Sequence, residues 1–196
     1  MGNFLGIDAS TQSMTGLVIN TSSAQIIAEE SVNFDEYYAE KYGVENGVLD
    51  AGNGVVHSPP LMWAEALEAL LRQLRESGIN LASIEAVSGS GQQHGTVYLN
   101  QSAAGVLGGL RSDLSLTDQL NGVFSRPTAP VWMDTSTRVQ CDEIETGVGG
   151  RQRLLELTGN TAFERFSGPQ IRKFAQQEPA AYERTTTICL VSSFVA

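Results

Sequence analysis

The first part of the chain alternates short apolar runs with groups of small or polar residues. The apolar runs at 4–8, 14–19 and 24–32 predict three strands, and the residues between them are typical of tight turns. Strands that follow one another this closely pair in an antiparallel arrangement, since a parallel crossover needs a longer connection. The pattern therefore predicts a three-stranded antiparallel meander at the start of the chain.

A helical pattern follows at 59–77. Pro59 suits a first helical turn, Gly78 suits the position after a last turn, and apolar residues recur between them at helical spacing. The segment before this helix, 33–57, is polar and rich in glycine. We expect it to be a long loop with one helical turn around 37–42. A loop of this length inside a compact domain is usually a functional or an inserted segment.

Shorter elements are predicted in the remainder. The strands are expected at 84–88, 96–99, 131–133 and 187–191. The helices are expected near 114–120, at 135–146 with Asp134 as the capping residue, at 150–157, and from 169 and 179 onward. Strands interleaved with helices are typical of an α/β protein.

Composition narrows the classes of protein that fit this pattern. The chain has 196 residues, 41% of them hydrophobic, which is enough to bury a core. Its 12 basic and 22 acidic residues give a net charge of −10, which disfavours binding to nucleic acid. No apolar run is long enough to cross a membrane, and no secretion signal opens the chain. We therefore expect a soluble, cytoplasmic protein without nucleic-acid or membrane partners.

The first candidate for chemistry is the turn after the first predicted strand. Asp8 ends that strand, and Ser10, Thr11, Gln12 and Ser13 follow it. Backbone N–H groups and hydroxyls in such a turn can hold a phosphate chain, and the carboxylate can hold Mg²⁺ through its waters. On these residues alone, an ordinary hairpin turn is the favoured interpretation.

A second candidate is the glycine-rich turn at 89–95. Its glycines permit close approach of a ligand to the backbone. Gln93 and His94 can each donate and accept hydrogen bonds, which suits a polyhydroxylated ligand. A histidine that is simply satisfied within a loop is an equally good interpretation of these residues.

Two further candidates lie later in the chain. Trp132 and Asp134 at the end of a strand could offer an aromatic face and a carboxylate to a sugar. The residues alone favour a core position for Trp132. For Asp134, a sugar-binding role and a role as the cap of the next helix are equally good interpretations. Arg165 could clamp hydroxyl or phosphate oxygens, although an ion pair with Glu164 fits its spacing better. Two histidines and two distant cysteines do not predict a metal centre with direct protein ligands.

Taken together, the order and spacing of these motifs resemble the FGGY carbohydrate kinases. The stretch 6–13 looks like the first phosphate loop of that family. Five further blocks look most like its xylulokinase branch of the eukaryotic type, namely SPPLMW at 58–63, GQQHG at 91–95, PVWMD at 130–134, ERFSG at 164–168 and LVSSF at 190–194. Several blocks in one order are far more specific than any one of them.

The resemblance implies a fold and a domain organisation. The fold is the ribonuclease-H-like (actin-like ATPase) fold, a mixed sheet in which the antiparallel three-strand meander is continued by parallel strands and flanked by helices. Residues 1–196 would be the N-terminal sugar kinase domain, and since the chain stops within an apolar run we expect it to be truncated before the C-terminal nucleotide-binding domain. The family's catalytic aspartate lies in that second domain, so no catalytic residue is expected here and the fragment should be inactive alone.

The resemblance also implies a reaction and its participants. ATP, with Mg²⁺, would phosphorylate D-xylulose to D-xylulose 5-phosphate. His94 and Arg165 match positions that bind the ketose, and Gln93, Asp134 and Trp132 are expected beside them. Asp8 and Thr11 match the phosphate and magnesium side, with Ser10, Gln12 and Ser13 next to them. The expected partners are the sugar and the chain's own C-terminal domain, and homodimerisation is left open.

Two alternatives stay open at this point. The chain could belong to an FGGY kinase for another sugar or polyol, such as ribulose, gluconate or glycerol, because hydroxyl-binding side chains do not name their sugar. It could also be a sugar-binding module without a catalytic half.

Overall fold

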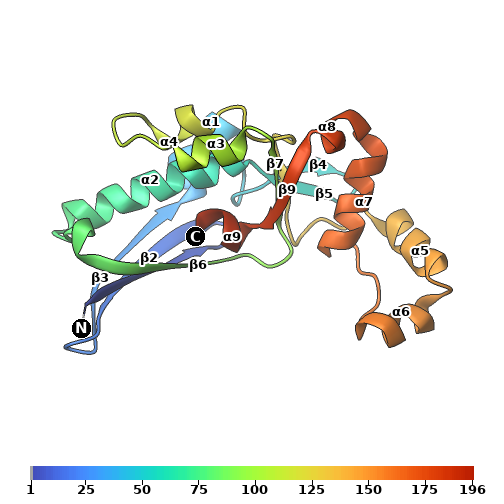
Figure 1. The fold of residues 1–196 in the computed structure, drawn as a ribbon, viewed down its shortest axis with the longest axis horizontal. Helices are drawn as coiled ribbons and strands as arrows, with labels where there is room; N and C mark the ends of the chain where they lie inside the picture. The colour runs from blue at the N-terminus through green and yellow to red at the C-terminus, as the bar shows by residue number, and fades with distance from the viewer. Residues whose placement is uncertain (1) are drawn as a thin grey trace.

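A sheet forms one end of the molecule, a group of helices forms the other, and the two ends give it the outline of an arch (Figure 1). The computed structural model describes residues 2–196. The strands are β1 (Asn3–Ala9), β2 (Ser13–Asn20), β3 (Gln25–Asn33), β4 (Leu49–Gly52), β5 (Val55–Ser58), β6 (Ile84–Gly91), β7 (Thr96–Asn100), β8 (Ala129–Pro130) and β9 (Thr185–Leu190). The helices are α1 (Phe34–Tyr42), α2 (Pro60–Glu76), the 3₁₀ turn η1 (Leu81–Ser83), α3 (Ala103–Gly108), α4 (Leu116–Leu120), α5 (Arg138–Gly147), α6 (Arg151–Thr158), α7 (Ser167–Gln177), α8 (Pro179–Glu183) and α9 (Val191–Val195).

The main sheet confirms the predicted meander. Its strand order is β3-β2-β1-β6, in which β2 is antiparallel to both β1 and β3, and β6 is parallel to β1. The sheet is therefore mixed, as the family resemblance implies. The parallel pairing brings the carboxyl ends of β1 and β6 together at one edge, with Asp8 opposite Ser90 and Ala9 opposite Gly91.

Helix α2 covers one face of this sheet and confirms the predicted helix. Leu5 and Ile7 alternate along β1 toward the buried face, as strand geometry requires. Gly16 on β2 allows close contact, because a Cβ atom there would lie 3.0 Å from the Leu70 side chain of α2. Leu70 and Leu74, one turn apart, are fully buried against the sheet.

The predicted helical turn at 37–42 is confirmed as part of α1, but the prediction of a long loop for the rest of 33–57 is wrong, because the segment also forms the β4–β5 hairpin. The Asn33 side chain caps α1 by accepting from the backbone N–H groups of Asp35 and Glu36. Gly43, in the left-handed region at φ 70°, ends the helix. The glycines of this segment therefore mark turns between short elements.

Strand pairing in the centre of the molecule joins distant segments. β7 does not pair with β6, the strand before it, but runs antiparallel to β9 from the far end of the chain. β5 pairs with both β4 and β8. The predicted strand at 131–133 is wrong, since β8 ends at Pro130 and a turn follows, and α5 begins only at Arg138.

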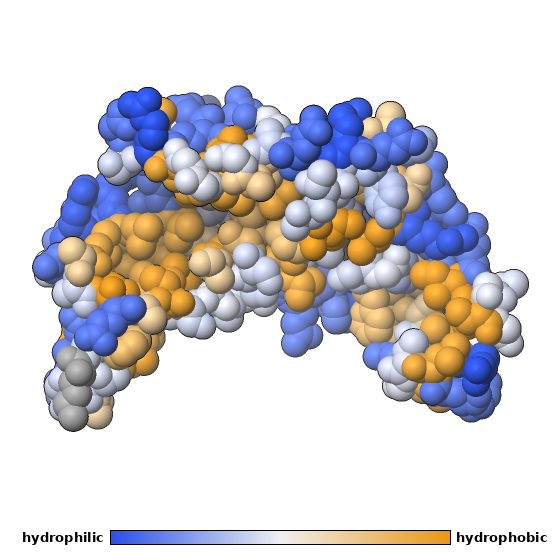
Figure 2. Space-filling view, in the orientation of Figure 1, coloured by the Kyte–Doolittle hydropathy of each residue, from blue (hydrophilic) through white to orange (hydrophobic). Residues whose placement is uncertain are grey.

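Helices α5, α6, α7 and α8 make up the other end of the arch (Figure 1). The underside of the arch is hollow, and apolar residues gather on it at both ends (Figure 2). Among residues 2–196, no helix has the length and apolar character needed to span a membrane.

Candidate functional site

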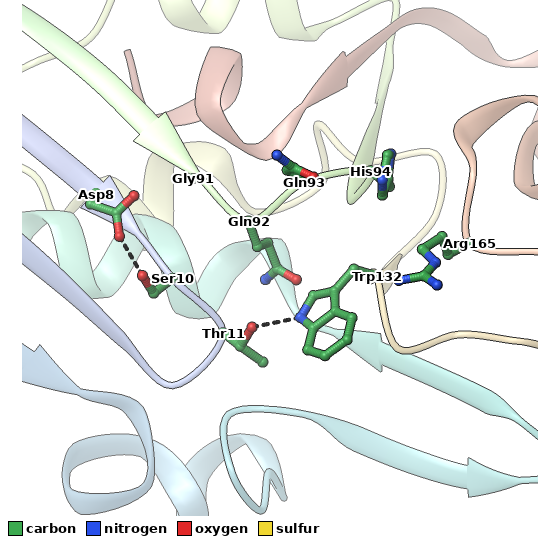
Figure 3. A pocket seen from close by; sticks show the side chains of 9 residues that line it. All are labelled: Asp8, Ser10, Thr11, Gly91, Gln92, Gln93, His94, Trp132 and Arg165. Carbon is green, nitrogen blue, oxygen red and sulfur yellow. Dashed lines mark hydrogen bonds between the residues drawn. The ribbon is translucent and has the colours of Figure 1, made fainter. Parts of the chain in front are cut away.

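A pocket opens where the carboxyl ends of the parallel strands β1 and β6 meet, which is where ligands bind in many α/β proteins. The turn after β6 is tied to β1, because the backbone N–H of Gln92 donates to the Ala9 carbonyl at 2.9 Å. The hollow measures about 340 Å³. It is lined by Asp8, Ser10, Thr11, Gly91, Gln92, Gln93, His94, Trp132 and Arg165 (Figure 3).

Asp8 is held in place at the strand end of this pocket. One of its carboxylate oxygens accepts a hydrogen bond from the Ser10 hydroxyl (Figure 3), and the other accepts from the Ser90 hydroxyl. The turn after β1 thus holds a carboxylate in one orientation beside hydroxyl groups. Among residues 2–196, no cluster of three or more carboxylate, histidine or cysteine side chains could hold a metal directly.

Trp132 joins the far wall of the pocket to the turn after β1. Its indole Nε1–H donates to the Thr11 hydroxyl at 2.9 Å, across 121 positions of sequence (Figure 3). The side chain is 42% exposed, so the interpretation of Trp132 as a core residue is wrong. With its N–H bonded to protein, an open aromatic face is left for a ligand.

Asp134, expected beside Trp132 in the sugar site, is fully buried and does not line the pocket. Its Oδ1 atom accepts from the Ser136 N–H at 2.9 Å and from Gln170 Nε2 at 2.7 Å, and its Oδ2 atom accepts from the Val56 N–H at 3.0 Å. It is not the N-cap of α5, which is Thr137. The carboxylate turns inward because three segments direct donors at it.

The charge state of Asp134 follows from these neighbours. Burial raises the pKa of the carboxyl, but the His57 ring and the donors on Ser136 and Gln170 more than offset this and hold the pKa well below its usual range. His57 contributes at longer range, since its Nε2 lies 3.5 Å from Oδ2. Asp134 is therefore an ionised structural centre beneath the pocket.

The same network fixes the segment that carries Arg165. Gln170 donates from Nε2 both to Asp134 and, at 3.1 Å, to the carbonyl of Glu164. The Thr137 hydroxyl donates to that carbonyl at 2.6 Å. Glu164 lies 3.6 Å from Arg138 instead of pairing with its neighbour. Within residues 2–196, Arg165 makes no ion pair, and its guanidinium is exposed at the pocket.

His94 sits in a constrained position on the opposite wall. Its backbone lies in the left-handed region at φ 67°, which is uncommon for a residue other than glycine. Its ring lies 4.8 Å, centroid to centroid, from the ring of Phe166. Burial lowers the pKa of His94, and the charge of Arg165 lowers it further. The imidazole is thus favoured in its neutral form, which can both donate and accept.

Gln12 and Ser13, expected on the phosphate side, line an adjoining hollow of about 540 Å³ instead. Gln12 Nε2 donates there to Asn46 Oδ1 at 3.2 Å. The two hollows share Ser10, Thr11 and Trp132. The structure therefore brings most of the expected residues into one pocket and leaves Gln12, Ser13 and Asp134 outside it.

Gln92 is the pocket residue that the sequence reasoning missed. The motif GQQHG singled out Gln93, but Gln92 is the buried member of the pair and Gln93 is exposed. Strand parity could not have found it, because β6 ends at Gly91 and Gln92 lies in the turn that follows.

The known proteins with similar sequences include several xylulose kinases. Over 195 residues the chain is 46% identical to Xylulose kinase 2 of Arabidopsis thaliana, covering 98% of the chain and 35% of that protein. Over 194 residues it is 40% identical to the Probable D-xylulose kinase A of Aspergillus clavatus, covering 98% of the chain and 34% of the relative. The chain is similar to these two xylulose kinases along nearly its whole length.

Solved structures support the same fold. A crystal structure of a xylulose kinase from Brucella ovis matches with a TM-score of 0.74 at 18% identity, covering 98% of this chain and 33% of that one. The chain has the actin-like ATPase fold of the FGGY carbohydrate kinases. No family model matches it. The chain spans about a third of the length of the curated xylulose kinases it matches, 35% of the Arabidopsis protein.

Proposed function

We propose that this chain is the N-terminal, sugar-binding domain of an ATP-dependent xylulose kinase, which phosphorylates O5 of D-xylulose. One observation carries the proposal. In a chain 46% identical to a xylulose kinase, a single pocket joins the Asp8–Thr11 turn to His94, Trp132 and Arg165. A kinase needs the phosphate side and the sugar side adjacent, so that the attacking hydroxyl lies in line with the transferred group.

On the sugar side, the pocket offers complementary groups. The Arg165 guanidinium donates to hydroxyl or carbonyl oxygens, and the neutral imidazole of His94 can donate or accept. The open face of Trp132 suits the C–H surface of a sugar. Gln93 lines the rim. Asp134 acts by positioning Trp132 and Arg165, because its carboxylate is bonded within the protein.

On the phosphate side, Asp8 and the hydroxyls of Ser10 and Thr11 face the same pocket. One carboxylate among hydroxyls fits Mg²⁺ held through its waters, and both oxygens of Asp8 already accept hydrogen bonds. Bound there with ATP, Mg²⁺ would offset charge on the phosphates. Gln12 and Ser13 extend this side into the adjoining hollow.

The chemical step needs a base that this pocket does not supply. The bond from O5 to the γ-phosphorus forms, the bond from that phosphorus to the bridging oxygen breaks, ADP leaves, and the O5 proton passes to a carboxylate. Asp8 is the carboxylate that lines the described pocket, and it is bound by two hydroxyls on the phosphate side. From the resemblance to the FGGY kinases we propose that the base lies in a C-terminal domain, and the chain alone is expected to bind sugar without turnover.

Calorimetric titration of the chain with D-xylulose tests this function. We expect binding by the wild type and its loss in the double variant His94→Ala, Arg165→Ala. The variant Arg153→Ala, a surface residue paired with Glu156, serves as the control and should bind normally. Parallel titrations with ribulose, gluconate and glycerol identify the preferred ligand. Absence of binding to D-xylulose by a demonstrably folded wild-type chain would contradict the proposal, and tighter binding of another ligand would reassign the substrate.

A further inference from the structure

Gln92 is a buried amide without a hydrogen-bond partner at the wall of the pocket. Its side chain is only 9% exposed, and among residues 2–196 neither Nε2 nor Oε1 has a partner. Its backbone is fixed, since its N–H donates to Ala9 at 2.9 Å. The side chain extends from the turn after β6 toward Thr11 and Trp132 (Figure 3).

No hydrogen bond joins this amide to the neighbouring groups, whose own hydrogen bonds run to other residues. The indole N–H of Trp132 is used by the Thr11 hydroxyl, and both oxygens of Asp8 are used by serine hydroxyls. A buried amide left unpaired is unfavourable, and such groups are rare in folded proteins. Among residues 2–196, single buried atoms of His57, Trp63 and Gln73 also lack a partner, but Gln92 lacks partners at both amide atoms and lines this pocket, which indicates that its amide is kept for a ligand.

We propose that Gln92 is a specificity-determining residue that pairs with one hydroxyl of the sugar; this rests on the proposed function. An amide has a carbonyl oxygen that accepts and an NH₂ group that donates, and a sugar hydroxyl can both donate to the oxygen and accept from the NH₂ group. A sugar that lacks this hydroxyl leaves the buried amide unpaired, so the site rejects it. The exposed Arg165 differs, because solvent satisfies it when a hydroxyl is missing.

This role predicts that removal of the amide lowers the selectivity for the sugar without lowering the stability of the fold. Gln92→Met replaces the amide with an apolar side chain of similar length. Since no hydrogen bond within the described residues is lost, the melting temperature should stay the same or rise, as is common when a residue kept for function is removed. A structural role would instead lower the melting temperature.

The test is calorimetric titration of the chain with D-xylulose and its monodeoxy analogues, together with thermal melting. The wild type should bind one analogue about ten- to a hundredfold more weakly because Gln92 is left unpaired. In Gln92→Met, the ratio between the dissociation constants of that analogue and of D-xylulose should fall toward one, while the ratios for the other analogues stay as in the wild type. Gln152→Met, an exposed glutamine on α6, is the control and should retain the wild-type pattern.

The remaining outcomes separate this proposal from the proposed function. If the wild type binds D-xylulose but Gln92→Met keeps the full discrimination pattern, the role of Gln92 is overturned and the sugar site stands. The same holds if Gln92→Met melts at a lower temperature and weakens all analogues equally. If the folded wild type binds neither D-xylulose nor any analogue, both proposals are overturned together.

Discussion

Two of the regions that line the pocket are organised in different ways. The turn from Asp8 to Ser13 joins the paired antiparallel strands β1 and β2. The region from Trp132 to Gln170 has little strand structure, and a buried carboxylate, Asp134, joins its segments. The comparison teaches that one wall depends on strand pairing and the other on a polar network. Each should fail when its own support is removed.

The largest effect is expected from Asp134→Ala. The change leaves donors on Val56, Ser136 and Gln170 buried without their acceptor, which should cost about 3 kcal/mol or more of unfolding free energy. Urea denaturation would measure this loss. Asp142→Ala, which removes a surface pair with Arg138, is the control and should change stability little. Equal losses in the two variants would contradict a special role for the network.

Acid should weaken the same region by protonating the same carboxylate. The pKa of Asp134 in the folded protein is held below its value of 3.8 in an unfolded chain. Its stabilisation is therefore complete above that value and is lost as the pH falls from there toward the folded pKa. Unfolding free energies measured across this range should fall more steeply for the wild type than for Asp134→Asn. Parallel curves would argue against Asp134 as the titrating support.

A smaller loss is expected from Gly47→Ala, which tests the first region. Gly47 lies at φ 75°, and a Cβ atom there would collide with the carbonyl oxygen of Thr11. Strain and collision together should cost about 2 kcal/mol and displace the turn. Gly52→Ala is a matched control at φ 77° with open space around it, and should cost about 1 kcal/mol. The idea fails if both variants unfold at the same urea concentration.

The smallest effect should come from the link between the two regions. Trp132→Phe keeps an aromatic face but removes the N–H that bonds Thr11. The bond should contribute about 1 kcal/mol, as a typical hydrogen bond does. A double-mutant cycle with Thr11→Val measures it, because the two single losses should not add. Strict additivity would show that the two regions are energetically independent.

The fold was predictable from sequence where local pattern decides it. The meander and α2 follow from alternation and helical spacing, and the structure confirms both. The hairpin within 33–57 was missed because its strands are short and its glycines look like loop residues. The pairing of β7 with β9 was not predictable from local pattern, since the partner lies almost ninety positions away, with Leu99 opposite Thr187.

The site was predictable in its residue types but not in their orientation. Motif comparison brought out Asp8, His94 and Arg165, and the structure places all three at one pocket. It could not tell that Asp134 turns inward, because the donors on Val56 and Gln170 come from distant segments. Nor could it separate Gln92 from Gln93, which differ only in which side of the backbone they occupy.

The exposed indole of Trp132 gives the pocket its own optical reporter. The chain has two tryptophans, and the other, Trp63, is fully buried. Fluorescence of an exposed indole responds to quenchers and to polarity, whereas a buried one is shielded. Emission on the long-wavelength side of the spectrum should therefore follow Trp132, and a sugar bound on its face should shift this emission and protect it from acrylamide. Occupancy of the pocket could then be read in solution without a label.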